Sequence, residues 1–203
     1  MTISFPASIQ SGRLSLTALT AADLPLYQSL YNNPLTMQFV GPCYPPAQSA
    51  LYFQHCLTKT QTAGSGWHFY TIKLRHQAKA VGLVSLIAKP FTQAPYEFGI
   101  LLETTARGCG YAEEALTALF LYCFTIAKLP ALLACVAPDN PGMQKHLSHF
   151  GFVNAPAALK KNAKLNSYLL LSTADTILQL TKRQQQFCRA QPAPLIPANP
   201  TSR

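Results

Sequence analysis

The sequence has few acidic residues and no long apolar run. Seven Asp and Glu residues stand against sixteen Lys and Arg, which gives a formal net charge of +9 over 203 residues. No window approaches the ~20 continuous apolar residues that a membrane-spanning helix needs. Residues 1–10 lack the basic region and the apolar stretch of a secretory signal peptide. We therefore expect a cytoplasmic protein that does not insert into a membrane.

The small number of acids limits any chemistry that needs a carboxylate base. The complete set is Asp23, Glu97, Glu103, Glu113, Glu114, Asp139 and Asp175, with five His as the alternative. A strong positive balance favours polyanionic partners, either nucleic acid or a phosphorylated small molecule. Because the basic residues form no run of five or more, a nucleic-acid partner is disfavoured. A solvated basic surface without a specific partner is the alternative interpretation.

Disulfide and metal motifs are missing as well. The six cysteines form no Cys-x-x-Cys pair, and the chain is too long to depend on disulfide cross-links. We expect mostly buried, reduced thiols. His146 and His149 could share a helix face, but no third ligand stands at a matching spacing, so we expect no metal.

Hydrophobic periodicity predicts one α/β (α+β) domain over residues 1–181, with a mixed, mostly antiparallel sheet and helices on both faces. Runs of period two at 67–74, 80–88 and 96–102 favour an antiparallel meander. Further strands are expected at 13–19, 131–137, 157–161 and 165–172. Helices are expected after Thr20, at 46–60, at 108–128 and between an N-cap at Asn140 and a C-cap at Gly151.

The composition changes near Lys182. Residues 182–203 are rich in Gln, Pro and Ala, with prolines at 192, 194, 197 and 200. Proline interrupts helices and central strands, so we expect an extended basic tail over the whole of 182–203.

A glycine-rich bend between a strand and a helix carries the clearest chemical signal. Gly108 and Gly110 let the backbone approach a ligand closely, and the first helical turn offers unpaired N–H groups with a partial positive charge. Such a bend suits a phosphate. It is neither a Walker A loop, because no Gly-Lys-Ser/Thr follows, nor a dinucleotide fingerprint, because Glu113 replaces the third glycine.

Two segments resemble the GNAT (general N-acetyltransferase) superfamily, and specifically its branch of RimJ and RimL ribosomal-protein N-terminal acetyltransferases. Residues 107–112 (RGCGYA) match the Q/R-x-x-G-x-G/A signature, and residues 140–152 are similar to the N-x-x-S…G-F segment. The resemblance spans about residues 11–172 and implies a GNAT fold with a V-shaped cofactor cleft between the strand ending at Leu102 and the strand at 131–137.

The resemblance implies acetyl-CoA as the cofactor. It assigns backbone groups of Ile100, Leu101 and Leu102 to the pantetheine arm, and it assigns the pyrophosphate to the signature loop. The residues implied in cofactor binding are Ile100, Leu101, Leu102, Arg107, Gly108, Cys109, Gly110, Tyr111, Ala112 and Asn140. The implied reaction is direct attack of a primary amine on the thioester, without a covalent enzyme intermediate.

Glu97 is the candidate catalytic base, because a protonated amine must lose a proton before it attacks. Its position matches a Glu often found on the equivalent strand of this branch. The alternative is a structural Glu that pairs with a Lys or caps a loop. Glu113 and Glu114 lie in the first turn of a helix, where negative charge is favourable, and we expect structural roles for both.

The sequence also departs from the family pattern. Met143 stands where the branch often has Ser, and Leu147 stands where many members have Tyr. The usual general-acid positions are therefore empty. His146 is a possible substitute, although a packing or surface role is the alternative. Trp67 is expected in the core, whereas His68 is a candidate for the acceptor pocket.

The first functional hypothesis is an N-acetyltransferase whose acceptor is a small amine or a protein N-terminus, acting as a monomer or homodimer. One alternative is a coenzyme A-binding module with little or no turnover. The other is a ribosome- or nucleic-acid-associated basic protein.

Overall fold

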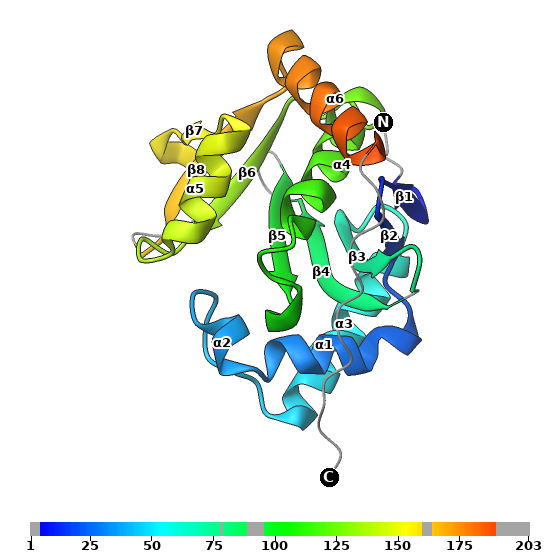
Figure 1. Cartoon of the computed structure of the whole chain (residues 1–203). Coiled ribbons are helices and arrows are strands. Elements are labelled where there is room, and N and C mark those ends of the chain that lie inside the picture. The colour runs from blue at the N-terminus through cyan, green and yellow to red at the C-terminus, as the bar shows by residue number, and fades with distance from the viewer. Residues whose placement is uncertain (1–4, 78, 89–95, 160–163, 190–203) are drawn as a thin grey trace.

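One eight-stranded sheet organises the computed structural model, which describes residues 5–77, 79–88, 96–159 and 164–189 (Figure 1). The strands are β1 Ser8–Gln10, β2 Leu14–Ala18, β3 Trp67–Leu74, β4 Ala80–Ile87, β5 Tyr96–Leu102, β6 Ala131–Val136, β7 Val153–Asn154 and β8 Asn166–Leu171. The α-helices are α1 Leu24–Tyr31, α2 Pro34–Met37, α3 Pro46–Gln61, α4 Tyr111–Thr125, α5 Pro141–Phe150 and α6 Ala174–Arg189. Three short 3₁₀ helices span Ala21–Asp23, Thr104–Ala106 and Ala157–Leu159.

The strand order is β1-β2-β3-β4-β5-β6-β8-β7. Neighbouring strands from β1 to β5 pair antiparallel, which confirms the predicted meander of β3, β4 and β5. β5 and β6 pair parallel, and β8 pairs antiparallel with both β6 and β7. The mixed, mostly antiparallel sheet is therefore confirmed, and its one parallel pair lies in the middle.

The two faces of the sheet support two separate hydrophobic cores. On one face α4, α5 and α6 bury a large core that contains Phe98 and Phe120. On the other face α1 and α3 bury a smaller core that contains Phe53 and Phe69. Successive side chains of a strand point to opposite faces, so Phe98 enters the large core while Leu101 packs against the small one. β5 thus contributes to both cores.

The predicted helix-end signals are confirmed. The Thr20 backbone N–H donates to Asp23 Oδ2 at 2.8 Å where the first helical segment begins. Asn140 Oδ1 accepts from the Met143 backbone N–H at 3.0 Å and caps α5, which Gly151 ends in the left-handed conformation at φ 85°. These short-range signals fix where the two helical segments begin and where α5 ends.

Two predicted segments were wrong. Residues 157–159 form a 3₁₀ turn instead of a strand, and the short strand β7 precedes it; residues 160 and 161 lie outside the described residues. The expected extended tail begins as a helix, because α6 continues through Lys182 to Arg189 and packs on α4. Thr173 Oγ1 accepts from the Thr176 N–H and starts α6, while Leu180 is buried. Residues 190–203 lie outside the described part of the chain.

The sequence pattern also missed β1 and α2, which are too short for a clear period. The cysteines were wrongly expected to be mostly buried. None of the six forms a disulfide, and Cys56 and Cys123 are buried, while Cys43, Cys109 and Cys188 are exposed.

Phe120 offers a direct test of the larger core. Its fully buried ring contacts the rings of Phe98, Phe150 and Phe152, with centroids 4.9, 5.2 and 5.8 Å away. Phe120→Ala should lower the free energy of unfolding by about 3–5 kcal/mol, because it leaves a cavity. Ile126→Ala, at a side chain that is 65% exposed, should change it by less than about 0.5 kcal/mol. Urea unfolding measures both, and equal losses would contradict this packing.

Candidate active site

A cleft opens where β5 and β6 separate. The two strands pair only at Tyr96 with Leu132 and at Glu97 with Leu133, and beyond these residues they diverge (Figure 1). A cavity of about 240 Å³ fills this region, and its walls include residues 97–101 of β5 and 134–136 of β6. The β6-facing edge of β5 after Glu97 has no paired strand among the described residues.

The cleft connects the two cores. Val84, Phe98 and Met143 line it on the side of α4 and α5. Tyr31, Phe69, Leu83 and Leu101 line it on the side of α1 and α3. The cavity between β5 and β6 therefore borders both cores.

Glu97 lines this cleft. Alternation along β5 places its side chain on the face of Gly99 and Leu101, toward α1 and α3. A Cβ at Gly99 would lie 3.1 Å from Ser85 Oγ, so the glycine leaves room for a second polar group beside Glu97. The predicted base thus lies inside the cleft, on the side of the smaller core.

The glycine-rich bend leads into α4. Gly108 and Gly110 both have φ of 76°, the left-handed region that other residues rarely adopt. A Cβ at Gly108 would meet nothing within 4 Å, so the backbone at this glycine is open to a ligand. Gly110 is the N-cap of α4, and the first N–H groups of that helix have no acceptor within it. This geometry fits a phosphate group at the start of α4.

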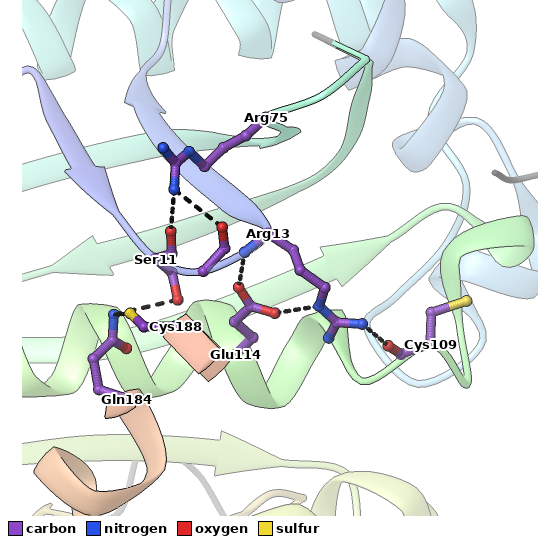
Figure 2. A network of polar contacts seen from close by, with 8 residues as sticks. Ser11, Arg13, Arg75, Cys109, Glu114, Gln184 and Cys188 are labelled. Atoms are coloured by element: carbon purple, nitrogen blue, oxygen red, sulfur yellow. Dashed lines mark hydrogen bonds and ion pairs between the residues drawn. The ribbon is translucent and has the colours of Figure 1, made fainter. Parts of the chain in front are cut away.

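An ion pair between Arg13 and Glu114 braces the bend (Figure 2). Glu114 is fully buried in the first turn of α4, and it accepts from the Arg13 backbone N–H and from Arg13 Nε, both at 2.6 Å. Arg13 Nη1 also donates to the Cys109 carbonyl at 3.1 Å, and its guanidinium lies 4.9 Å from the centroid of the Tyr111 ring. One arginine therefore holds both the bend and the helix that follows it.

The β1–β2 turn that carries Arg13 is itself held from two sides. Arg75 Nη1 donates to the carbonyls of Ser11 and Gly12 at 3.0 Å each, and Gln184 of α6 donates to Ser11 Oγ at 3.3 Å (Figure 2). A Cβ at Gly12 would overlap the Phe187 carbonyl, so the turn packs directly on α6. The whole arrangement fixes Arg13 before any ligand binds.

The other predicted cofactor residues fall into three groups. Ile100, Leu101 and Asn140 line the cleft, although Asn140 Oδ1 already caps α5. Leu102, the last residue of β5, is not among the residues that line this cavity. The remaining residues lie at the bend and the start of α4. Arg107 donates to the Leu35 carbonyl from Nη1 at 3.2 Å and from Nη2 at 3.3 Å. Cys109 is exposed, whereas Tyr111 is buried and Ala112 is half-buried in α4.

The candidate histidines lie away from the cavity. His68, a candidate for the acceptor pocket, does not line this cavity, because its ring packs on Phe5 and Tyr96, on the sheet face opposite Glu97. Burial lowers the pKa of His68 to about 4, so its imidazole is neutral near pH 7. His146 on α5 does not line the cavity, whereas Met143 does. Glu113 bonds His149 Nε2 at 3.0 Å, a structural role as expected.

Sequence reasoning missed the aromatic wall of the cleft. Tyr31 lines the cavity, and its ring lies between those of Tyr27 and Tyr44, with centroids 4.2 and 5.7 Å away. The Tyr44 backbone N–H donates to the Tyr31 carbonyl at 3.1 Å and fixes the loop before α3. Burial raises the pKa of Tyr31 above its ordinary value, so the phenol stays neutral. The spacing of Tyr27 and Tyr31, one helical turn apart, was the available signal.

Among the described residues, no three His, Cys, Asp or Glu side chains gather closely enough to hold a metal ion. No described helix has the length and apolar character that crossing a membrane requires.

Comparison with known proteins decides the family. The family model of the acetyltransferase (GNAT) domain matches residues 13–153. The chain belongs to the GNAT acetyltransferase family. None of the curated proteins gives a significant match. The GNAT fold, an open mixed sheet with helices on both faces, is thereby confirmed.

Solved structures of acetyltransferases share this fold. An acetyltransferase from Agrobacterium tumefaciens str. C58 is 26% identical, with a TM-score of 0.71 over 84% of this chain and 96% of that one. A GNAT-family acetyltransferase from Bacillus anthracis is 17% identical, with a TM-score of 0.66 over 81% and 98%. The spermidine N-acetyltransferase of Vibrio cholerae, solved with CoA and spermine, is 22% identical, with a TM-score of 0.66 over 82% and 98%.

Loss of the Arg13–Glu114 ion pair should strongly destabilise this GNAT domain. Glu114→Gln should lower the free energy of unfolding by about 3 kcal/mol, because it leaves Arg13 without its buried counter-charge. Glu113→Gln is the matched control one position away, where the pairs with His149 and Arg183 are partly exposed, and should cost less than about 1 kcal/mol. Denaturant titration of both variants measures the difference. A Glu114→Gln variant as stable as the control would contradict the bracing role.

Proposed function

We propose that this GNAT domain is an acetyl-CoA-dependent N-acetyltransferase that acts on a primary amine. The observation that carries the proposal is the cleft itself, which reaches both faces of the sheet and has Glu97 in its wall. The glycine bend that begins α4 adds a phosphate-binding geometry. Two substrates with different chemistry could thus enter from opposite faces and react between β5 and β6.

The open edge of β5 supports the placement of the cofactor. Backbone groups after Glu97 face β6 without strand pairing, and an extended pantetheine arm could bond to them as an added strand does. The amides at Gly108, Gly110 and the first turn of α4 would receive the pyrophosphate. Arg13 and Glu114 would hold these amides in position, which reduces the ordering that binding requires.

Acetyl-CoA supplies the acetyl group as a thioester. The amine nitrogen would form a bond to the acetyl carbon as the C–S bond breaks, and the second proton that the nitrogen loses on becoming an amide would pass to the departing sulfur, directly or through water, so that coenzyme A would leave as the thiol. Glu97 would accept the proton that the ammonium must lose before attack, directly or through water. The cleft would hold the amine and the thioester close together, so that the reaction needs no covalent enzyme intermediate.

Met143 favours a second candidate, a coenzyme A-binding module with little or no turnover. Its thioether lines the cavity at the position where the related branch often has Ser, and it cannot donate a proton to a leaving thiolate. The resemblance to the RimJ and RimL branch supports a protein N-terminus as one possible acceptor. A small amine is the other.

Coenzyme A binding and thiol release separate the two candidates. We expect coenzyme A to raise the melting temperature of the protein, and acetyl-CoA with a panel of amines and peptides to release free thiol faster than acetyl-CoA alone. A melting shift without thiol release from any acceptor would favour the binding module. Neither effect would contradict both candidates.

Glu97→Gln should separate catalysis from cofactor binding. The substitution preserves size and removes the base, so kcat should fall by roughly 100-fold or more while the Kd for coenzyme A changes little. Asp175→Asn is the matched control, since Asp175 is an exposed acid at the start of α6. Steady-state kinetics and calorimetry measure the two quantities. Unchanged kcat in the Glu97→Gln protein would remove Glu97 from the mechanism.

A further inference from the structure

Arg107 joins the glycine bend directly to another part of the cleft. From the position before Gly108, its side chain donates from Nη1 and Nη2 to the Leu35 carbonyl at 3.2 and 3.3 Å. Leu35 belongs to α2, which lies 72 residues earlier in the sequence and follows α1. Phe39 and Val40, just after α2, line the cavity. One side chain therefore connects the candidate phosphate site with a segment of the cavity wall.

The short helix α2 depends on hydrogen bonds from outside its own backbone. A helix leaves its last four carbonyls without partners inside the helix, and α2 is only four residues long. At its start, Asn33 Oδ1 accepts from the Leu35 and Thr36 backbone N–H groups at 2.9 and 3.4 Å. For the Leu35 carbonyl, Arg107 supplies the donors. The order of α2 thus depends on a residue of the glycine bend.

Arg107 also brings a positive charge to the bend that no described acid neutralises. Arg13, which braces the same bend, is paired with the buried Glu114. In the part of the chain that the structure describes, no carboxylate forms an ion pair with Arg107, and its side chain is exposed. Because the guanidinium fork matches the geometry of a phosphate, Arg107 is well suited to an anion that binds at the bend.

The guanidinium group can hold two acceptors at once. It has five N–H donors in one plane, and the Leu35 carbonyl accepts one from each Nη. The Nε donor and the second hydrogen of each Nη point away from that carbonyl and can reach a phosphate oxygen. A long side chain that one partner has already ordered loses less conformational entropy when it binds a second. The two contacts of Arg107 should therefore strengthen each other.

We propose that Arg107 is a positioning residue that couples the cofactor site to the acceptor side of the cleft. With phosphate at the bend, Arg107 is fixed on the Leu35 carbonyl and holds the α2 segment, residues 34–41, more firmly in the cavity wall. The surface that the amine contacts is then complete only after the cofactor has bound. This inference rests on the proposed acetyltransferase function, which places the phosphates at the bend.

Hydrogen exchange tests the coupling without any amine. In the native full-length protein, saturating coenzyme A should slow amide exchange in residues 34–41 by about threefold to tenfold, the effect of one ordered side chain. Arg107→Gln, saturated with coenzyme A as calorimetry verifies, should show little slowing. Arg189→Gln, which removes the same charge from the exposed end of α6, should keep the native slowing. Equal slowing in the native and Arg107→Gln proteins overturns the proposal.

The same measurement separates coupling from a simple cap on α2. A cap alone would make exchange faster in Arg107→Gln by the same factor with and without coenzyme A, and that result overturns the coupling. Coupling predicts a larger factor with coenzyme A bound. Arg107→Lys keeps the charge but lacks the planar fork, so it should retain more coenzyme A affinity than Arg107→Gln and still lose the slowing. Native slowing in Arg107→Lys overturns the role of the fork.

Asn33→Ala tests the coupling in the reverse direction. Coupling is reciprocal, so a loosened α2 should weaken coenzyme A binding although Asn33 does not line the cavity. Calorimetry should show a Kd about twofold to fivefold higher in the native background and no change in the Arg107→Gln background. Asn33→Ser, the matched control, keeps a capping oxygen and should leave the Kd near its native value. An equal rise in both backgrounds overturns the coupling.

Failure of the coupling and failure of the proposed function give different results. Slowing that depends on Arg107, without thiol release from any amine, supports the coupling and contradicts the transferase function. Thiol release without such slowing overturns the coupling and leaves the transferase function intact. A native protein that does not bind coenzyme A overturns both.

Discussion

The limited pairing of β5 with β6 is the constraint on which the site depends. Two residue pairs join these strands, at Tyr96 and Glu97, and the strands then diverge. Longer pairing would close the sheet and separate the two cores by a continuous wall. The divergence instead leaves a cavity lined by residues of both cores, and among the described residues no strand pairs with the β6-facing edge of β5 after Glu97. The cleft thus results from hydrogen bonds that β5 and β6 do not make with each other beyond these pairs.

The acids of this basic protein are used mainly to build the fold around that opening. Glu114 is buried against Arg13 and ties the β1–β2 turn to the start of α4. Asp23 joins the Thr20 backbone to Lys73. Since an unpaired buried charge is costly, each of these acids carries its own cation. Glu97 lies in another place, the wall of the cleft.

Local patterns predicted the parts of the site that lie close together in the sequence. The glycine bend, the Asn140 cap and the three-strand meander each depend on a few adjacent residues, and the structure contains all of them. The Arg13–Glu114 pair joins positions 101 residues apart, so no periodicity could reveal it. Helix α6 was missed because prolines beyond Arg189 dominated the composition of the segment that it begins.

The aromatic wall and the separation of β5 from β6 are tertiary features. Tyr31 and Tyr44 come from a helix and a loop, and only the folded chain stacks their rings, nearly parallel at 4°. Strand patterns predict that β5 and β6 exist but not how far they remain paired. The face that His68 reaches was open for a related reason, because alternation along β3 decides which face a residue reaches only once the register with β4 is known.

The most direct test of the account is a crystal structure of the protein with coenzyme A. We predict that the pantetheine arm follows the unpaired edge of β5, with the sulfur in the cleft near Glu97 and the pyrophosphate on the amides of Gly108 and Gly110. Coenzyme A bound away from the β5–β6 cleft, or with its phosphates remote from the start of α4, would contradict it.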